Sequence, residues 1–265
     1  MKSVTRRQLF VPLGLAAGSC VLSSCLSENR VSSESKDKKA GFPWFYAELD
    51  PERTAERAYY DCRKGHCMYG VFAPVMMQLA EKRGEPYRSF PVDMMRYGGG
   101  GTGGSGSLCG ALNGGAALIG LFARSEDETN KLIAGLFLWY EQTKLPAYVP
   151  PKSVLNMEMP TSVSNSILCH VSISRWCAAS GHKAFDDKRN ERCCRLTADV
   201  ARKTIEILNA NFIGKYRADA ALSEGDKACH SCHTKGSELS NTRGNMSCGG
   251  CHFTLAKEHP KVSAG

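Results

Sequence analysis

Apolar side chains recur at helical spacing through most of the chain between residues 50 and 211. The repeat is clearest in a run with i, i+3 and i+4 spacing that stops before Gly84 and contains Met68, Val71, Phe72, Val75, Met76 and Leu79. The pattern predicts helices over 50–64, from Gly65 to Gly84, and over about 107–123, 125–140, 164–180 and 188–211. No segment alternates apolar and polar residues convincingly, so we expect a mainly α fold.

Capping residues support two of these helix starts. Asp50 is a typical N-cap and is followed by Pro51, a residue favoured at the first helical position. Ser125 precedes an acidic first turn, which favours a helix beginning there. Four prolines predict an irregular connector between the fourth and fifth helices: Pro146, Pro150, Pro151 and Pro160.

The first 24 residues predict an export signal. Arg6 and Arg7 precede an apolar run too short to span a bilayer, and the pair resembles a twin-arginine signal. We therefore expect residues 1–24 to be removed and the mature protein to be periplasmic. Cys25 ends a sequence that resembles a lipoprotein cleavage site, which predicts membrane attachment through a lipidated Cys25; a plain signal peptide is the alternative. The polar residues 25–45 predict a tether.

Charge and composition narrow the class of protein. The net charge of +8 is spread along the chain, which does not indicate nucleic-acid binding. Thirteen cysteines in 265 residues indicate either disulfides or bound metal. Because the twin-arginine route exports folded proteins, it favours a cofactor that is assembled before export.

The strongest chemical signal is a repeated C-x-x-C-H sequence near the C-terminus, which is the attachment sequence for c-type haem. Each motif supplies two thiols for the vinyl groups of one haem and a histidine for its iron. These residues are Cys229, Cys232 and His233 in the first motif and Cys248, Cys251 and His252 in the second. A zinc ribbon is the alternative for the four cysteines, but it leaves both histidines unexplained. We therefore predict two haem c groups.

Residues 220–265 hold few large apolar side chains, too few to cover two haems. We therefore expect the haems to contact each other closely and two subunits to form a homodimer. Each iron also needs a ligand at its sixth position. His230 and His259 are candidate distal ligands, because each could reach a neighbouring haem; the alternative for both is an exposed histidine.

A glycine-rich loop contains the string G-x-G-x-x-G at residues 101–106, the fingerprint of a dinucleotide-binding loop. That fingerprint requires a β-strand before it, and residues 90–96 contain a proline and no run of β-branched residues. The loop instead leads to Cys109 near the start of a predicted helix. Because helix N-termini and glycine N–H groups stabilise thiolate-ligated clusters, we predict that Cys109 binds an iron–sulfur cluster. Disulfides are the alternative, although the seven cysteines from residue 62 to 194 cannot all pair.

Four segments resemble the C_GCAxxG_C_C family of redox-active proteins. They are Gly65-His66-Cys67, the glycine run leading to Cys109-Gly110-Ala111-Leu112-Asn113-Gly114, Ile167-Leu168-Cys169, and the segment from Cys194 to Ala201. With the two C-x-x-C-H motifs after them, residues 50–260 resemble the split-Soret cytochromes c. The resemblance implies a homodimer whose subunits each carry two covalent, histidine-ligated haems near one another and a [2Fe–2S] cluster. It also implies an axial haem ligand that crosses between subunits.

On this resemblance the cluster ligands fall on Cys67, Cys109, Cys169 and Cys194, while Cys177 and Cys193 are nearby alternatives; the choice of four stays open. We expect a helical iron–sulfur domain at 46–215, followed by a small, irregular di-haem segment at 216–265. The predicted function is periplasmic electron transfer, by a carrier rather than an enzyme. The alternatives are a haem- or cluster-based reductase of a small substrate and a zinc-binding structural module.

Overall fold

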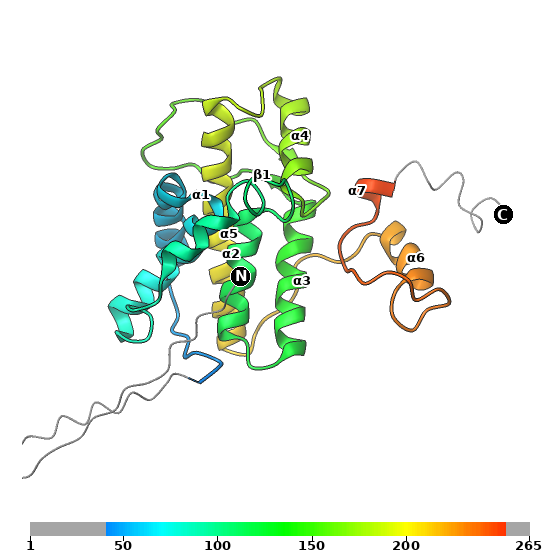
Figure 1. The fold of residues 1–265 in the computed structure, drawn as a ribbon, viewed down its shortest axis with the longest axis horizontal. Helices are drawn as coiled ribbons and strands as arrows, with labels where there is room; N and C mark the ends of the chain where they lie inside the picture. The colour runs from blue at the N-terminus through cyan, green and yellow to red at the C-terminus, as the bar shows by residue number, and fades with distance from the viewer. Residues whose placement is uncertain (1–40, 253–265) are drawn as a thin grey trace, which may run out of the picture. The chain divides into compact units, whose positions relative to one another are not determined.

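The structure is a computed structural model that describes residues 41–252 and confirms the mainly α fold (Figure 1). Its helices are α1 (Pro51–Arg83), the 3-10 helix η1 (Val92–Gly98), α2 (Gly110–Phe122), α3 (Glu126–Gln142), α4 (Cys169–Ser180), α5 (Asp187–Phe212), α6 (Glu224–His233) and α7 (Gly249–His252). Two short strands, β1 (Lys144–Leu145) and β2 (Ser162–Val163), pair in antiparallel fashion. The predicted signal peptide, Cys25 and His259 lie outside the described residues.

Helix α1 consists of two helical segments joined at Gly65 and His66. Neither residue has helical torsion angles, with φ −147° and ψ 19° at Gly65 and φ 67° and ψ −175° at His66. A side chain at position 65 would place its Cβ atom 2.4 Å from the ring of Tyr69, so only glycine fits there. The break predicted at Gly65 is therefore confirmed, and the second helical segment begins at Cys67.

Both predicted caps are present. Asp50 accepts hydrogen bonds from the backbone N–H groups of Glu52 and Arg53, and Ser125 accepts one from Glu128. Such caps satisfy N–H groups that lack a partner within the helix.

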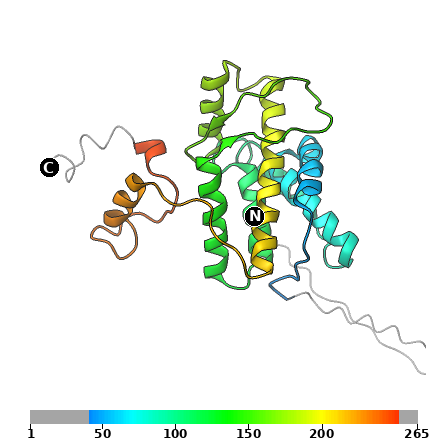
Figure 2. The ribbon, with the colours of Figure 1, turned by 180° about the vertical axis from the view of Figure 1, so that it is seen from behind.

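The core lies where α1 packs along α5 and against α2, and α3 covers the other side of α2. Figures 1 and 2 show these helices side by side from opposite directions. Each of the four helices contributes side chains that are fully buried or nearly so, including Leu79, Ile119, Leu136 and Leu208. Burial of such a side chain stabilises the fold by about 1.5–3 kcal/mol.

Two helices begin later than their periodicity predicts, because the residues before them pair with each other. Helix α2 begins at Gly110 and α4 at Cys169. Between them Leu108 and Leu168 form an antiparallel bridge, in which the N–H of Cys109 donates to Ile167 over 2.9 Å. The N–H of Cys169 donates in turn to Ser107 over 2.7 Å. The bridge brings two cysteines that are distant in the sequence to adjacent helix starts.

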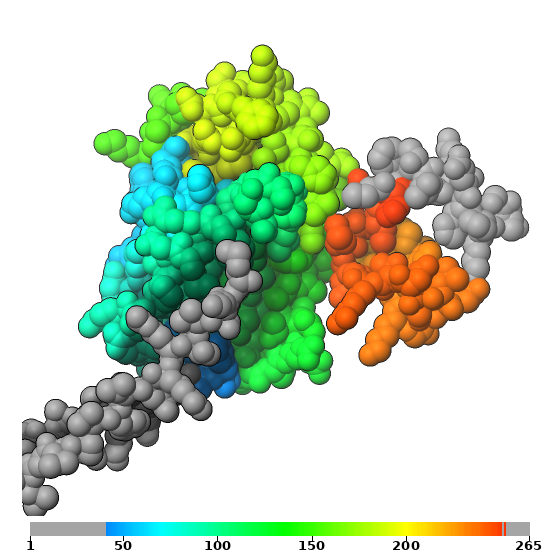
Figure 3. Space-filling model, in the orientation of Figure 1, coloured from blue at the N-terminus to red at the C-terminus, as the bar shows by residue number. Residues whose placement is uncertain are grey.

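Residues 217–250 carry the two C-x-x-C-H motifs and are mostly exposed or half-buried, as the orange surface in Figure 3 shows. Within that range Asp226 alone is buried. The predicted domain boundary at 215/216 falls in the connection between α5 and α6 and stays a prediction, since both helices belong to one unit of contacts. None of the helices within residues 41–252 combines the length and apolar character needed to cross a membrane.

Candidate functional site

Six of the cysteines between residues 62 and 194 gather where α1, α2, α4 and α5 meet. Cys67 lies at the centre, and its side chain interacts with those of Cys193 and Cys62. Burial raises the pKa of the Cys109 thiol, and the charge of Cys67 raises it further. Burial likewise raises the pKa of Cys169 to about 12, with Cys109 and Cys67 contributing. Cys67, Cys109 and Cys169 are therefore close enough to influence one another electrostatically.

Three of these cysteines stand at the N-terminal ends of helical segments. Cys67 follows the break in α1, Cys109 is the N-cap residue of α2, and Cys169 is the first residue of α4. Helix N-termini carry partial positive charge and N–H groups without helical partners. Three such ends directed at one place stabilise an anionic group there.

The fourth thiol of this group comes from Cys193 rather than from its neighbour. Cys193 interacts with Cys67, whereas Cys194 interacts with Cys62. Cys194 and Cys62 belong to a small buried cluster that also contains Tyr59 and Tyr148. The structure thus groups Cys193, which the family pattern gave only as an alternative, with Cys67, Cys109 and Cys169.

Cys177 lies elsewhere on α4. It is eight residues beyond Cys169, which corresponds to about 12 Å along the helix axis. The two cysteines are therefore not neighbouring ligands. Cys62 was not among the predicted ligands, and no motif in the sequence distinguishes its position near Cys67.

The cysteines gathered around Cys67, namely Cys109, Cys169 and Cys193, form with it a site that suits a soft metal. Hydrogen bonds with Cys193 and Cys62 hold the pKa of Cys67 well below its usual range, so Cys67 is the thiol most readily ionised. Metal binding requires thiolates, and thiolates favour iron–sulfur clusters among other soft centres.

Glycines make room beside these thiols. A Cβ atom at Gly110 would lie 2.2 Å from the carbonyl oxygen of Gly98 and 3.3 Å from Cβ of Cys67. Gly101 has a positive φ of 69°, and a Cβ there would lie 3.0 Å from Cβ of Cys169. The β-strand that a dinucleotide-binding loop requires is absent before this loop, as expected, since η1 precedes it. The glycines instead let the backbone approach the cysteines closely.

No three described His, Cys, Asp or Glu side chains are arranged to hold a single metal ion. The thiols are distributed over four neighbouring helical segments instead. Such a distribution suits a centre with more than one iron, because its thiolates attach to different metal atoms.

The first haem motif lies on α6. Cys229 and Cys232 are three residues apart and face the same side of the helix, as attachment to one haem edge requires. Nδ1 of His233 lies 2.8 Å from Oδ1 of Asn241. A proton in that hydrogen bond places the lone pair on Nε2, the nitrogen suited to binding iron.

The second motif lies against the first. Burial raises the pKa of the Cys248 thiol, and the adjacent Cys229 raises it further, so the two motifs bring their first cysteines together. Asp226 links the motifs by accepting hydrogen bonds from the N–H of Cys248 over 2.7 Å and from the hydroxyl of Ser247 over 3.2 Å. His252 is exposed, and the side chain of Cys251 is outside what the structure describes.

His230 lies between the cysteines of the first motif. Its Nε2 atom is buried and has no hydrogen-bond partner among the described residues. A buried imidazole nitrogen without a partner is unfavourable unless a group absent from the polypeptide binds it. This observation fits the predicted role of His230 as a distal ligand.

The second motif also contacts the helical part of the chain. A Cβ atom at Gly250 would lie 2.5 Å from the carbonyl oxygen of Asn165. Glu141, at the end of α3, accepts hydrogen bonds from the N–H of Ser247 at 3.3 and 3.4 Å. Burial raises the pKa of Glu141 to about 7. The second haem motif therefore lies beside the segment that leads from Asn165 to Cys169.

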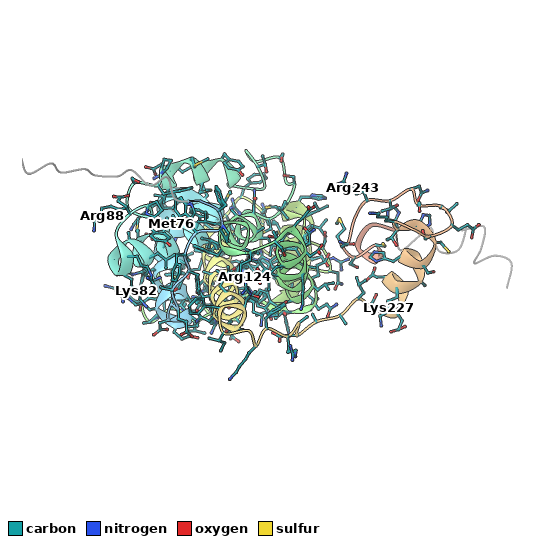
Figure 4. All side chains as sticks on the ribbon, turned by 90° about the horizontal axis from the view of Figure 1, so that it is seen from below. Met76, Lys82, Arg88, Arg124, Lys227 and Arg243 are labelled. Carbon is teal, nitrogen blue, oxygen red and sulfur yellow. The ribbon has the colours of Figure 1, made fainter. Side chains whose placement is uncertain are left out.

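Two surface pockets occur elsewhere, and neither has a cysteine or histidine in its wall. One includes Arg124 and the other Met76 and Arg88, which are labelled in Figure 4. These pockets do not open onto the thiol group or the haem motifs.

The fold and the two sites define a class of helical, cysteine-rich redox proteins. Residues 72–207 match the family described as "Putative redox-active protein (C_GCAxxG_C_C)". The chain is 36% identical to the split-Soret cytochrome c of Desulfovibrio desulfuricans (strain ATCC 27774 / DSM 6949 / MB), and the match covers 98% of each chain. The chain therefore belongs to the C_GCAxxG_C_C family and, over nearly its whole length, to the split-Soret cytochromes c.

A solved structure supports the same relationship. It concerns a novel iron centre in the split-Soret cytochrome c from Desulfovibrio desulfuricans ATCC 27774. The two structures superpose with a TM-score of 0.75 at 36% sequence identity, over 82% of this chain and 93% of the other. The relative is thus a cytochrome c with an iron centre, and its fold is shared by this chain.

Proposed function

We propose that this chain is a periplasmic electron-transfer protein whose subunits each carry two covalent haem c groups and a [2Fe–2S] cluster, and which acts as a homodimer. The bound irons would supply one-electron oxidation and reduction. The polypeptide would hold them at fixed positions and shield them from solvent. Membership of the split-Soret cytochromes c supports the redox role.

The residues that would hold the haems are those of the two C-x-x-C-H motifs. Cys229 and Cys232 would bind one haem with His233 as the proximal ligand, and Cys248 and Cys251 the other with His252. His230 and His259 are the proposed distal ligands. The contact between Cys229 and Cys248 supports attachment of the two haems side by side.

The residues that would hold the cluster are Cys67, Cys109, Cys169 and Cys193. Three of them present helix N-termini to one place, and the fourth interacts directly with Cys67. This set replaces Cys194 of the family pattern by Cys193 in our proposal.

One observation carries the electron-transfer proposal: a single short segment belongs to both sites. Asn165 and Ser166 contact Gly250 of the second haem motif, and Cys169 begins α4 at the thiol group. Cys169 is only four positions after Asn165 in the sequence. Electron transfer between two redox sites requires such proximity, whereas two metals with independent structural roles do not need to lie close together.

The location and assembly rest on the sequence. The twin-arginine signal supports export, and Cys25 supports attachment to the membrane by lipidation. The exposed character of residues 217–250 supports a homodimer, because two haems attached there would need cover from another subunit.

The test is a spectroscopic and chemical analysis of protein matured with periplasmic haem attachment. We expect two haems per chain that resist acid–acetone extraction, together with additional iron and acid-labile sulfide. We also expect dithionite-reduced haems and cluster to be reoxidised together by substoichiometric oxidant. Haem that is lost on extraction would overturn the covalent attachment. Absence of iron beyond the haems would overturn the cluster.

Carbon monoxide distinguishes an electron carrier from a reductase. Two six-coordinate haems leave no position for it, so we expect no spectral change when it is added to the reduced protein. Ready binding would favour a five-coordinate haem and a reductase, and it would count against His230 and His259 as ligands. A Soret band that divides on reduction would support haems in contact.

A further inference from the structure

Arg192 of α5 is a buried cation with no carboxylate partner in the described part of the chain. Its side chain is 2% exposed. Nη2 donates to the hydroxyl of Ser172 over 2.7 Å, Nη1 lies 4.0 Å from the sulfur of Cys193, and Nε has no partner among the described residues. Burying an unpaired guanidinium is costly unless an anion accompanies it.

Two nearby arginines differ from Arg192 because each has a carboxylate partner. Arg195, one turn further along α5, is 4% exposed and donates to the fully buried carboxylate of Glu191 over 2.8 Å. Arg63 pairs with the same carboxylate. The fold therefore supplies a carboxylate to these two arginines and leaves Arg192 among thiols and hydroxyls.

The side chains around Arg192 include cysteines of the proposed iron centre, which become anionic thiolates when they bind metal. Burial alone would lower the pKa of the guanidinium, but Cys193, Tyr140 and Cys109 raise it on balance. Ser172 fixes the side chain, since it also accepts a hydrogen bond from Tyr140 over 2.8 Å. Tyr140 in turn lies against Cys109.

We propose that Arg192 is the counter-ion of the iron centre, donating hydrogen bonds toward its thiolates and raising its reduction potential. This inference rests on the proposed function. A thiolate-bound cluster is anionic, and it becomes more negative when it is reduced. A fixed cation in a site of low dielectric constant stabilises the reduced form more than the oxidised form.

Substitutions of Arg192 in the haem-containing protein test this role by redox titration of the centre, followed by electron paramagnetic resonance. We expect Arg192→Met to lower the potential by about 59 mV or more, a tenfold change in the one-electron equilibrium, or to release the iron while both haems stay attached. Arg192→Lys keeps a cation in place and should retain the iron with a smaller shift. The haem potentials provide an internal reference.

Arg189 provides the matched control. It lies one turn earlier on α5 and donates to the carbonyl oxygen of Ala184 over 2.6 Å, so Arg189→Met removes a nearby charge without removing a contact to the thiols. Its shift should be well below that of Arg192→Met.

Three results would decide against the assignment or its basis. An unchanged potential in Arg192→Met would overturn it. So would loss of iron from Arg192→Lys as complete as from Arg192→Met, since shape rather than charge would then matter. If the wild-type protein holds no iron beyond its haems, the proposed cluster itself fails.

Discussion

Cys193 and Cys194 are consecutive residues of α5, yet their thiols interact with different partners, Cys67 for the first and Cys62 for the second. Successive residues of an α-helix point about 100° apart, so two adjacent cysteines face different neighbours. Cys193 is therefore the one of the two that interacts with Cys67, the thiol that in turn influences Cys109 and Cys169. The ligand set of the proposed iron centre depends on this difference.

Replacement of each cysteine by serine tests the assignment. We expect Cys193→Ser to lose the non-haem iron and the acid-labile sulfide, because it removes a thiolate from the group around Cys67. Cys194→Ser should retain both, since the Cys194 thiol interacts with Cys62, whereas the Cys193 thiol interacts with Cys67 itself. Iron and sulfide per haem are the measurement, and intact haem content confirms that each variant matured. The reverse outcome would restore Cys194 as the ligand.

Gly110 and Gly120 lie on the same helix but in opposite steric situations. A Cβ at Gly110 would meet the backbone oxygen of Gly98 at 2.2 Å, while no atom lies within 4 Å of a Cβ at Gly120. We expect Gly110→Ala to lower the free energy of unfolding by about 1–3 kcal/mol, as overpacking does, and to weaken iron retention.

Gly120→Ala is the control for this substitution. Replacing an exposed helical glycine by alanine should raise the free energy of unfolding by about 0.5–1 kcal/mol. Urea unfolding followed by far-ultraviolet circular dichroism measures both variants. Equal effects of the two substitutions would show that helix propensity, rather than contact with Gly98, decides the result.

Local signals were sufficient to predict much of the helical architecture. Asp50 and Ser125 cap helices as expected, and Gly65 marks a break at which the close approach of Tyr69 leaves no room for a side chain. These features depend on short-range chemistry. The C-x-x-C-H motifs are equally local, so both could be located from the sequence.

Contacts between distant segments could not be predicted in this way. Periodicity extends α2 and α4 too far toward their N-termini, because it does not reveal that Leu108 pairs with Leu168. The same pairing brings Cys109 beside Cys169. The direction of Cys193 and the missing carboxylate at Arg192 likewise depend on how α5 packs, and a helical pattern alone gives no signal for either.

The contacts of the Glu128 carboxylate make the free energy of unfolding depend on pH. Its carboxylate accepts from the Arg124 guanidinium, from the backbone N–H of Arg124, and from the Asn211 side chain, which joins α3 to α5. The Arg124 guanidinium contributes most to holding the pKa of Glu128 at about 2, below its ordinary 4.5, although burial acts in the opposite direction. The group therefore stabilises the folded state above pH 4.5, and this contribution is lost as the pH falls toward 2.

Glu128→Gln should remove that part of the acid destabilisation. We expect its free energy of unfolding to approach the wild-type value as the pH is lowered from 5 to 2.5, after a deficit at pH 7. Glu126→Gln lies in the same first turn and leaves the contacts of Glu128 in place, so it should follow the wild-type profile. A constant difference between Glu128→Gln and wild type across this range would exclude the proposed contribution.

The hydrogen bonds of Asp226 lead to a prediction about the relative orientation of the two proposed haems. Hydrogen bonds from Ser223, Cys248 and Ser247 outweigh burial and lower the pKa of Asp226, so its carboxylate is ionised and binds the start of the second motif to α6. Asp226→Ala leaves the N–H of Cys248 without this acceptor, at a cost of about 1–3 kcal/mol. We expect both haems to remain covalently attached, because no attaching cysteine changes, but to lose their fixed relative orientation. The measurement is circular dichroism in the Soret region, where coupled haems give a signal with two lobes of opposite sign that should weaken.

Glu224→Ala is the matched control, since Glu224 lies on α6, is exposed, and pairs with Lys227. A signal that is unchanged in Asp226→Ala, or equally weakened in Glu224→Ala, would show that Asp226 does not set the contact between the haems.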